Sequence, residues 1–550
     1  MRVDIALASS STARARMSSS AAAKVSLLSA EEGEAGLADG SAAAPRAAAS
    51  VITARLYACA LLGSAGAMQF GLNIGVVNAP QAVIAGDLDI STLQLSLVVA
   101  AFSAAAFLGA TLAPRWVDAW GRRPFLIALQ WFFVAGGALC AAVAFLKDAQ
   151  KEAAYALLVA ARLLFGLGSG AVSVAVPMYL GEIAPAHLKG AFGALNQFGI
   201  VVLILVGQLV SLGMCSSALW PWMWAGSGAL GVAVILASGP LLLESPRWLV
   251  SHGRAAEARD VLLACRGYSA ADADAEVAEI EDESGGADAA EKRGDKPASM
   301  SLMQIVADPV LRAPLIVACM LQLTQQFSGI NAVFFYSTSF FEAAVATPGD
   351  GSQGANGTPS AQAVQIGIYG TIATGVINVV ATAASIPLIE RAGRKPLLLW
   401  ATGGMLMCSL LLTGVLVAKD YVPDISQTLG WLSIAFVLIY VCFFEVGLGA
   451  IPWSIGGEMF PEDSRATAMS AAAACNWAAT TVVGLFFPIV QEALGNYSFA
   501  PFAAWLLCAF PFVVFYVPET KGKSPLELLR WFGAKAGAGG AYASINTDDA

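Results

Sequence analysis

Charged residues are scarce in this sequence: Asp, Glu, Lys and Arg make up 13% of its 550 residues, whereas hydrophobic residues make up 57%. Soluble globular proteins have about 25% charged and roughly 45–50% apolar residues. So few charges cannot cover the surface of a soluble chain of this length, which excludes a string of soluble domains. The 54 glycines and 13 tryptophans are instead typical of bilayer-spanning helices, where glycine permits close helix contact.

Residues that bind metals, nucleotides or nucleic acids are also few. The two histidines, His187 and His252, cannot assemble a multi-histidine metal site, and none of the nine cysteines falls in a C-x-x-C pattern. No G-x-x-x-x-G-K-[ST] loop for ATP is present. The net charge of −9 disfavours binding to a phosphate backbone. We therefore expect no metal, no cofactor, no nucleic-acid partner and no enzymatic activity.

Apolar runs of about 20 residues, long enough to cross a bilayer as helices, recur along the chain. The sequence contains twelve, at 56–78, 92–114, 124–146, 154–178, 190–212, 221–243, 312–340, 364–388, 396–418, 429–453, 466–490 and 498–517. The longest polar interruption, 244–311, divides them six and six. The predicted parts are a disordered tail (1–50), a six-helix half (51–243), a linker with a helical domain (244–307), a second six-helix half (308–517) and a tail (518–550).

The loops on the two sides of the membrane differ sharply in Lys and Arg. With the N-terminus placed in the cytoplasm, the outer loops contain only Lys147, Lys151 and Lys419 as basic residues. Because positively charged loops stay in the cytoplasm, both termini are expected there. We expect the plasma membrane. A plastid or other organelle envelope is the alternative, because the first 24 residues contain a single acid, Asp4, as transit peptides do. Asn356 is a candidate glycosylation site.

Three short loop patterns occur twice at nearly one spacing, all on the predicted inner side. They are DAWGRR (118–123) with ERAGRK (390–395), GEIAP (181–185) with GEMFP (457–461), and LESPR (243–247) with PETK (518–521). Three repeats at one spacing indicate two homologous halves, an architecture used for alternating access around a central site. The acids and bases in these patterns can form ion pairs that bias such a cycle. The alternative is that the bases only set the topology.

Amides are conspicuous inside the apolar runs, where charges are nearly absent apart from Arg162 and Glu445. They include Asn73, Gln197, Gln325, Gln326, Asn331, Asn378 and Asn476. An amide both donates and accepts hydrogen bonds, as a hydroxyl does. The pattern therefore favours a neutral polyhydroxy substrate over an ion, although a single amide can also serve as an interhelical hydrogen bond.

Several longer stretches carry a resemblance to a known family. They are QFGLNIGVVNAPQ (69–81), WGRRPF (120–125), VPMYLGEIAPAHLKGAFGALNQFGIVV (176–202), ESPRWL (244–249), QLTQQFSGINAVFFYSTSFF (322–341), ERAGRKP (390–396), FFEVGLGAIPWSIGGEMFP (443–461) and VPETKGKS (517–524). Over about residues 56–532 the chain resembles the sugar porter family of the major facilitator superfamily, in particular its facilitative glucose transporters. The resemblance implies an all-α membrane protein with the major facilitator fold, twelve transmembrane helices in two six-helix halves and a small cytoplasmic helical domain.

The resemblance also implies roles for individual residues. It implies a sugar site formed by Gln197, Gln325, Gln326, Asn331, Asn378, Phe444, Glu445, Gly449, Trp453 and Asn476. It implies a gating network of ion pairs formed by Arg122, Arg123, Glu182, Glu244, Arg247, Glu390, Arg394, Glu458 and Arg465. In the family the seventh and tenth helices are broken, and Gly447, Gly449 and Pro452 suit such a break here.

The expected function is facilitative hexose transport. Proton-driven relatives have an Asp in the first helix where this chain has Asn73, and an amide cannot exchange a proton. We therefore expect uniport, with proton-coupled sugar or polyol (inositol) symport as the alternative. Thr324, in place of the Ser of a Gln-Leu-Ser triplet associated with glucose, leaves a hydroxyl and favours glucose. A non-transporting sugar sensor is a further alternative, and the oligomeric state stays open.

Overall fold

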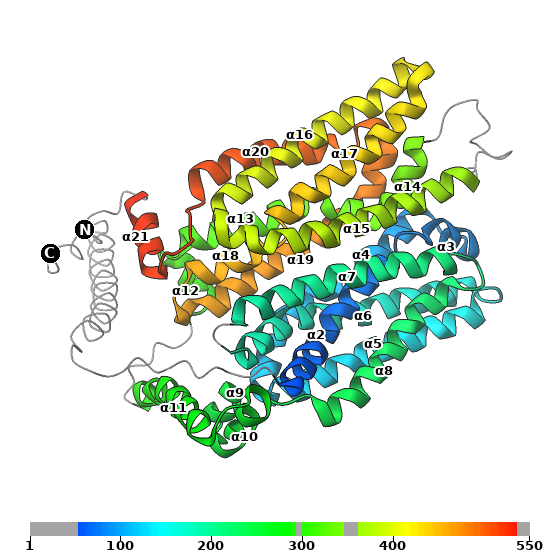
Figure 1. Cartoon of the computed structure of the whole chain (residues 1–550). Helices are drawn as coiled ribbons and strands as arrows, with labels where there is room; N and C mark the ends of the chain where they lie inside the picture. Colours follow the sequence, from blue (N-terminus) through cyan, green and yellow to red (C-terminus); the bar gives the residue numbers. More distant parts are fainter. Residues whose placement is uncertain (1–52, 186–187, 293–299, 346–360, 536–550) are drawn as a thin grey trace, which may run out of the picture.

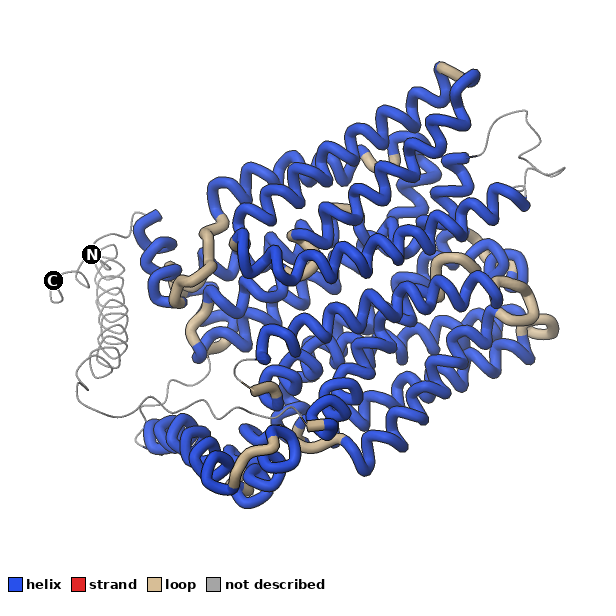
Figure 2. Tube along the Cα trace, in the orientation of Figure 1, coloured by secondary structure: helices blue, strands red, loops and turns tan. Residues whose placement is uncertain are grey.

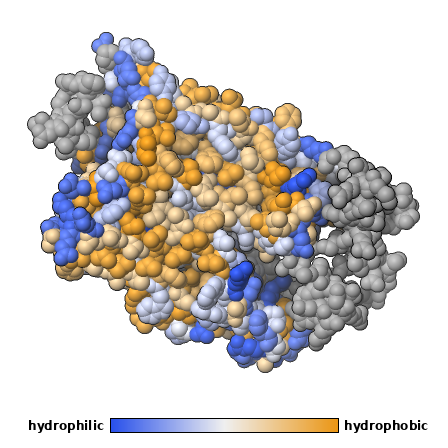
Figure 3. Space-filling view, turned by 180° about the vertical axis from the view of Figure 1, so that it is seen from behind, coloured by the Kyte–Doolittle hydropathy of each residue, from blue (hydrophilic) through white to orange (hydrophobic). Residues whose placement is uncertain are grey.

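The computed structural model describes residues 53–185, 188–292, 300–345 and 361–535, and within these ranges the regular structure is helical. The N-terminal tail and Asn356 lie outside the described residues. Figure 2 shows long helices joined by short loops. In the space-filling view an apolar belt crosses the middle of the molecule, and hydrophilic side chains gather toward its two ends (Figure 3). This surface is the one expected of a protein solvated by lipid around its middle.

Seven helices form the first half over its described residues, 53–185 and 188–241. They are α2 (Ala54–Gly75), α3 (Gln81–Leu88), α4 (Thr92–Trp120), α5 (Arg122–Leu146), α6 (Lys151–Ile183), α7 (Lys189–Met214) and α8 (Trp220–Leu241). Helix α4 packs along α6, α5 packs along α6 and α8, and α2 packs along α7. Glycines allow this close packing: a Cβ on Gly170 of α6 would lie 2.0 Å from the Ala106 carbonyl oxygen of α4.

The second half begins with two helices that occupy a single predicted span. Its helices are α13 (Arg312–Phe327), α14 (Ile330–Val345), α15 (Ala361–Ala392), α16 (Arg394–Tyr421), α17 (Ser426–Val446), α18 (Ile451–Met459), α19 (Glu462–Leu494) and α20 (Ala500–Tyr516), with short 3₁₀ turns at Pro423–Ile425 and Gly495–Tyr497. Helix α13 packs on α19, α14 on α15, and α16 on α17 and α20.

Helices or helix pairs thus stand at all twelve predicted spans. Within the described residues, nine helical segments, one of them α17 together with α18, are by themselves long and apolar enough to cross a membrane. Helix α20 is apolar but has 17 residues. The other two positions are taken by α2 and by the α13–α14 pair.

In the described part of the chain, four helices lie between the two halves and a fifth follows the second half. They are α9 (Pro246–Ser251), α10 (Ala255–Arg266), α11 (Ala270–Lys292), α12 (Leu302–Ala307) and α21 (Pro525–Lys535). All five lie at one end of the molecule, which we call the helical-domain end (Figure 1). The opposite end, where α3 lies, is called the far end.

Two spans of the second half are interrupted. Helix α13 ends at Phe327 and α14 starts at Ile330, with Gly329 between them at φ +94°, a conformation that favours glycine. A Cβ on Gly329 would also lie 2.5 Å from the ring of Phe502. The second break separates α17 from α18 at residues 447–450, and Pro452 stands in the first turn of α18. The breaks implied by the family resemblance are therefore present.

The two halves meet along α4 with α19 and along α7 with α15. At the far end, hydrogen bonds join them. Asn78, just after α2, donates to the Phe334 carbonyl at 3.0 Å and to Ser337 Oγ at 2.6 Å, and accepts from the Thr338 N–H at 3.1 Å. Gln81 donates to the Phe335 carbonyl at 2.5 Å. These bonds attach the first half to α14.

Candidate functional site

A cavity lies between the two halves. It encloses about 1050 Å³ of empty space, part of it open to solvent. All ten residues expected to contact a sugar line it: Gln197, Gln325, Gln326, Asn331, Asn378, Phe444, Glu445, Gly449, Trp453 and Asn476. Gln197 comes from α7 of the first half, and the other nine come from the second half. The structure thus brings together residues that are up to 279 positions apart, as Gln197 and Asn476 are.

The amides of α13 bind those of α19. Asn476 Nδ2 donates to Gln325 Oε1 at 2.6 Å and to Gln322 Oε1 at 2.7 Å, and its Oδ1 accepts from Gln326 Nε2 at 3.0 Å. Asn331 Nδ2 donates to Gln326 Oε1. Because each amide is held by another, their donors and acceptors have fixed directions. Such a polar network is stable when buried only if its members are satisfied.

Helix α13 also binds the break between α17 and α18. Gln325 Nε2 donates to the carbonyls of Leu448 and Gly449, at 2.6 and 3.0 Å, and Gln322 Nε2 donates to the Pro452 carbonyl at 3.2 Å. The Leu448 and Gly449 carbonyls are free to accept because they lie in the unwound segment between α17 and α18, whereas the Pro452 carbonyl lies in the first turn of α18. Gln322, Gln325 and Gln326, which are spaced i, i+3 and i+4 on one face of α13, therefore connect the cavity to a part of the backbone that can bend.

Glu445 is the carboxylate of the cavity, and it is 2% exposed. Its Oε2 accepts a hydrogen bond from Thr382 Oγ1 of α15 at 2.9 Å. Gly449 lies directly beside it, since a Cβ at that position would be 2.6 Å from the same oxygen. The absence of a side chain at Gly449 thus leaves room for the carboxylate at the wall of the cavity.

Other polar atoms of the cavity have no partner. Asn378 is fully buried, and neither its Nδ2 nor its Oδ1 makes a hydrogen bond. Asn196 Oδ1, from the first half, also has no partner. Leaving such a group unsatisfied costs about 1–3 kcal/mol. Unsatisfied donors and acceptors on both sides of a cavity are suited to a ligand that supplies hydroxyl groups.

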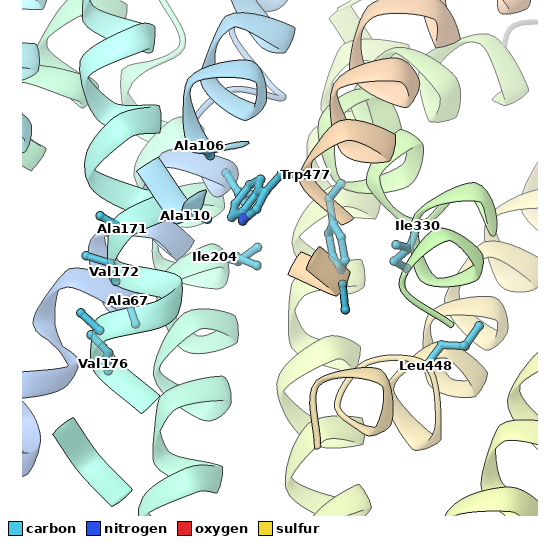
Figure 4. Packing of buried hydrophobic residues seen from close by; sticks show 14 of the residues in the cluster. Ala67, Ala106, Ala110, Ala171, Val172, Val176, Ile204, Ile330, Leu448 and Trp477 are labelled. Atoms are coloured by element: carbon cyan, nitrogen blue, oxygen red, sulfur yellow. The ribbon is translucent and has the colours of Figure 1, made fainter. Parts of the chain in front are cut away.

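Aromatic rings form one wall of the cavity. Trp477 of α19 approaches Phe70 and Phe102 of the first half, with ring centroids 5.5 and 6.4 Å apart. Figure 4 shows Trp477 and Ile204 in the space between the two groups of helices. These rings offer apolar faces beside the amides, a combination that suits the C–H face of a sugar ring.

Arg162, the second charge predicted within a span, lies outside the cavity lining and is fully buried. Its Nε donates to the Val98 carbonyl at 3.2 Å and its Nη1 to the Asn73 carbonyl at 3.3 Å. Its guanidinium carbon lies 4.6 Å from the centre of the Phe102 ring. The guanidinium is therefore held by carbonyls and an aromatic face. Asn73, the residue of α2 next to this guanidinium, contributes only neutral groups.

Comparisons with known proteins agree with this architecture. Residues 59–532 match the family described as sugar (and other) transporter. The chain is 35% identical over 515 residues to rat solute carrier family 2, facilitated glucose transporter member 3, covering 90% of this chain and 96% of the relative. It is 37% identical over 497 residues to mouse member 4 of that family, covering 86% and 90% of the two chains.

The chain belongs to the sugar transporter family.

Solved structures show the same fold. The partially occluded inward-open form of the xylose transporter XylE from E. coli aligns with a TM-score of 0.68 and 23% identity, over 86% of this chain and all of that one. XylE bound to 6-bromo-6-deoxy-D-glucose, described as a major facilitator superfamily protein, aligns with a TM-score of 0.67. This sugar transporter family member therefore has the major facilitator fold, as expected from its sequence.

In this family member, the repeated loop patterns form matching clusters at the helical-domain end. Arg122 binds Glu182 through two hydrogen bonds of 2.9 Å, and Arg394 binds Glu458 at 2.8 and 3.1 Å. Arg122 also contacts Asp118 at 3.1 Å. Each of these pairs lies within one half. In this state these ion pairs therefore hold each half together.

In each half a carboxylate caps the helix that begins at the repeated Gly-Arg segment, α5 in the first half and α16 in the second. Glu244 accepts from the backbone N–H groups of Arg122 and Arg123, at 2.9 and 3.2 Å, and Glu519 accepts from those of Arg394 and Lys395, at 2.9 and 3.0 Å. Negative charge at a helix N-terminus is stabilising. Burial, the largest influence, raises the pKa of Glu244 above its ordinary value despite these N–H groups. Burial also raises that of Glu519, but the surrounding backbone N–H groups together lower its pKa below the ordinary value.

Glycine is required where these carboxylates approach. Gly121 and Gly393, which precede the capped helices α5 and α16, have φ of +94° and +88°. A Cβ on either would lie 2.5 or 2.7 Å from an oxygen of Glu244 or Glu519. The two halves thus repeat both a backbone conformation and the side chain that caps it.

Four other residues were predicted to belong to the gating network. Arg123 donates to the Gly239 carbonyl at 2.7 Å, and Arg465 donates to the Phe460 carbonyl at 3.2 Å. Glu390 is exposed to solvent. Arg247 follows Pro246 in the first turn of α9.

Glu519 is a network residue that the family resemblance did not supply. Its position in the repeat, as the counterpart of Glu244, is the signal that could have identified it. Thr520, whose hydroxyl donates to Glu458, was also missed, although it follows Glu519 in the repeat as Ser245 follows Glu244. In the cavity, the missed polar residues are Ser173, Asn196 and Thr480.

Proposed function

We propose that this protein is a facilitative hexose transporter, with glucose as the preferred substrate, that carries sugar down its gradient by alternating access. The observation that carries the proposal is the amide-lined cavity between the halves. Amides offer donors and acceptors to hydroxyls without attracting ions. The relatives named facilitated glucose transporters support the choice of sugar.

We propose further that the ten residues lining the cavity are the sugar site. The amides of Gln325, Gln326, Asn331 and Asn476 exchange bonds with one another for bonds with sugar hydroxyls, and Asn378 gains the partners that it lacks. Since Gln325 also binds the carbonyls of the α17–α18 break, sugar binding alters the forces on that break. The break and the one at Gly329 then allow the cavity to close over the substrate.

The clusters around Arg122–Glu182 and Arg394–Glu458 are proposed as the gating network. In the state described here, hydrogen bonds join the halves at the far end, while those ion pairs stay within each half. This arrangement supports a state closed at the far end. We place the helical-domain end in the cytoplasm of a plasma-membrane protein, because nearly all basic loops lie there.

Uniport is proposed over proton-coupled symport. Arg162 is held by the Asn73 and Val98 carbonyls and by Phe102, and the position of the coupling carboxylate is taken by Asn73. The Asn73 side chain at this first-helix position cannot exchange a proton once per cycle. The relative described as a proton:xylose symporter shares the fold at 23% identity.

Uptake by reconstituted vesicles tests these proposals. The purified protein should equilibrate labelled glucose across the membrane, and an imposed pH difference should not raise the internal concentration above the external one. Competition by hexoses, pentoses and inositol gives the preferred substrate, which we expect to be glucose. Accumulation driven by the pH difference would establish symport, stronger competition by inositol would establish a polyol carrier, and binding without flux would establish a sensor.

A further inference from the structure

Gln208 of α7 is a buried amide that the cavity does not explain. Its side chain is 2% exposed, and neither its Nε2 nor its Oε1 has a hydrogen-bond partner. It is not among the residues that line the cavity. Buried polar groups almost always have a partner, so an amide with both ends unsatisfied requires an explanation.

The amide is held in the contact between the two halves. It faces Gly375 of α15, where a Cβ would lie 2.0 Å from Gln208 Oε1. Helices α7 and α15 belong to opposite halves and pack along one another. Only a glycine on α15 leaves space for the Gln208 side chain in this contact between α7 and α15, which we call the seam.

Gln208 continues the cavity face of α7 toward the far end. Gln197, Val201 and Ile204 line the cavity, and Gln208 follows Ile204 by one helical turn on the same face. On α15, Gly375 lies one turn from the cavity residue Asn378 in the same direction. Gln208 therefore lies beyond the cavity, on the side of the far end.

The next contacts in that direction are those that close the far end. Thr371, one turn beyond Gly375 on α15, exchanges hydrogen bonds with Ser337 and Thr338 at 2.9 and 2.8 Å. Those two residues in turn bind Asn78 of the first half. Gln208 thus lies between the cavity and the closed end, in a seam that must open if solute enters from that end.

We propose that Gln208 is a second sugar-binding residue, used only in the state that is open at the far end. It binds a hydroxyl of the incoming hexose before the sugar reaches the amides of α13 and α19. When the seam closes, Gln208 loses the sugar hydroxyl. Its Nε2 and Oε1 are then both without a hydrogen-bond partner, as observed. This inference rests on the proposed hexose transport and adds a residue and a state to it.

A structural role for Gln208 is the competing explanation. An amide that holds two helices together makes hydrogen bonds in the packed state, and Gln208 makes none there. A purely structural amide should therefore stabilise the protein, whereas an unsatisfied one should destabilise it. The two explanations predict opposite changes in stability when the amide is replaced by an apolar side chain of similar size.

The experiment compares Gln208→Leu and Gln208→Asn with the wild type and with Leu209→Met, a neighbouring change on the exposed side of α7. Inhibition of labelled glucose uptake is measured with unlabelled glucose and with each monodeoxyglucose, added at the far side. We expect Gln208→Leu to weaken inhibition by glucose about ten-fold and Gln208→Asn to weaken it less. For one deoxyglucose, the one that lacks the bound hydroxyl, the loss should be at most about two-fold.

A loss by the same factor for every sugar means that Gln208 only biases the conformational equilibrium, and it overturns the proposal. An unchanged inhibition by glucose overturns it as well. Thermal unfolding without sugar should show Gln208→Leu to be at least as stable as the wild type, and a clear decrease would establish the structural role instead. A wild type that takes up no hexose overturns the proposed function itself, and this inference with it.

Discussion

Asn476 of α19 donates a hydrogen bond of 2.6 Å to Gln325 of α13, and the other end of the Gln325 amide donates to the Leu448 carbonyl at the α17–α18 break. One side chain therefore connects two helices and a flexible segment. The hydrogen bond from Asn476 fixes the orientation of the Gln325 amide toward a sugar. The length of the Gln325 side chain allows the same amide to reach the carbonyl at the break.

Replacing Gln325 by alanine should raise the half-saturating glucose concentration at least ten-fold, because hydrogen bonds to the sugar and to the break are both lost, at roughly 0.5–1.5 kcal/mol each. Asn476→Ala should have a similar effect, since it removes the hydrogen bond that orients the Gln325 amide. Labelled glucose uptake by reconstituted vesicles measures both. Gln427→Ala, an exposed amide on α17, is the matched control and should leave uptake unchanged. Unaltered uptake by Gln325→Ala would contradict the proposed site.

The two ion pairs of the repeat should differ in strength. The side chains of Arg122 and Glu182 are 11% and 16% exposed, whereas those of Arg394 and Glu458 are 21% and 26% exposed. Arg122 also binds both carboxylate oxygens of Glu182, whereas both bonds of Arg394 go to Oε1 of Glu458. A more buried, bidentate pair is less screened by water and has the better geometry. Double-mutant cycles with Gln at each position, followed by thermal unfolding, should give a coupling energy of about 1–3 kcal/mol for the first pair. A larger coupling for the second pair would contradict this reasoning.

Gly329 should be intolerant of a side chain. Its φ of +94° opposes alanine, and so does the Phe502 ring, which would lie 2.5 Å from an added Cβ. Gly329→Ala should therefore lower the unfolding free energy by about 1–3 kcal/mol and slow transport by stiffening the break. Gly414 lies inside α16, where an added Cβ would meet no atom within 4 Å, so Gly414→Ala should be neutral or slightly stabilising. Equal effects of the two substitutions on the melting temperature would refute this explanation.

The charge of Glu519 should stabilise the second half at neutral pH. Burial alone would raise its pKa, but the backbone N–H groups that it caps bring the pKa below the ordinary 4.5. A lowered pKa means that the carboxylate stabilises the fold above that ordinary value, and that this stability is lost as the pH falls through the lowered pKa.

Glu519→Gln should therefore decrease the melting temperature at pH 7, and the difference from the wild type should shrink as the pH falls below about 4.5. Glu244→Gln should decrease the melting temperature at pH 7 by less than Glu519→Gln does, because burial raises the pKa of Glu244 and makes its charged form less favourable. A difference for Glu519→Gln that is independent of pH would show that charge plays no part in this cap.

Much of this protein could be predicted from its sequence, and the reason is the environment in which it folds. A chain in lipid must form helices wherever it is apolar over about 20 residues, because unpaired backbone groups are costly there. The helix positions, the duplicated halves and the ten cavity residues were therefore accessible from apolar runs, loop repeats and motifs that resemble a known family.

Tertiary structure decided what depends on contacts between distant residues. Gln325 and Gln326 of α13 were predictable as site residues, but not that they bind Asn476 or that Gln325 binds the carbonyls of the α17–α18 break. Arg122 and Glu182 were predictable as network residues, but only the packing shows that their pair stays within one half in this state. Gln208 carries no signal in the sequence beyond being an amide in an apolar run. Its amide is unsatisfied only because α7 and α15 pack over it. The order of residues along the chain does not specify which helices of the two halves come into contact.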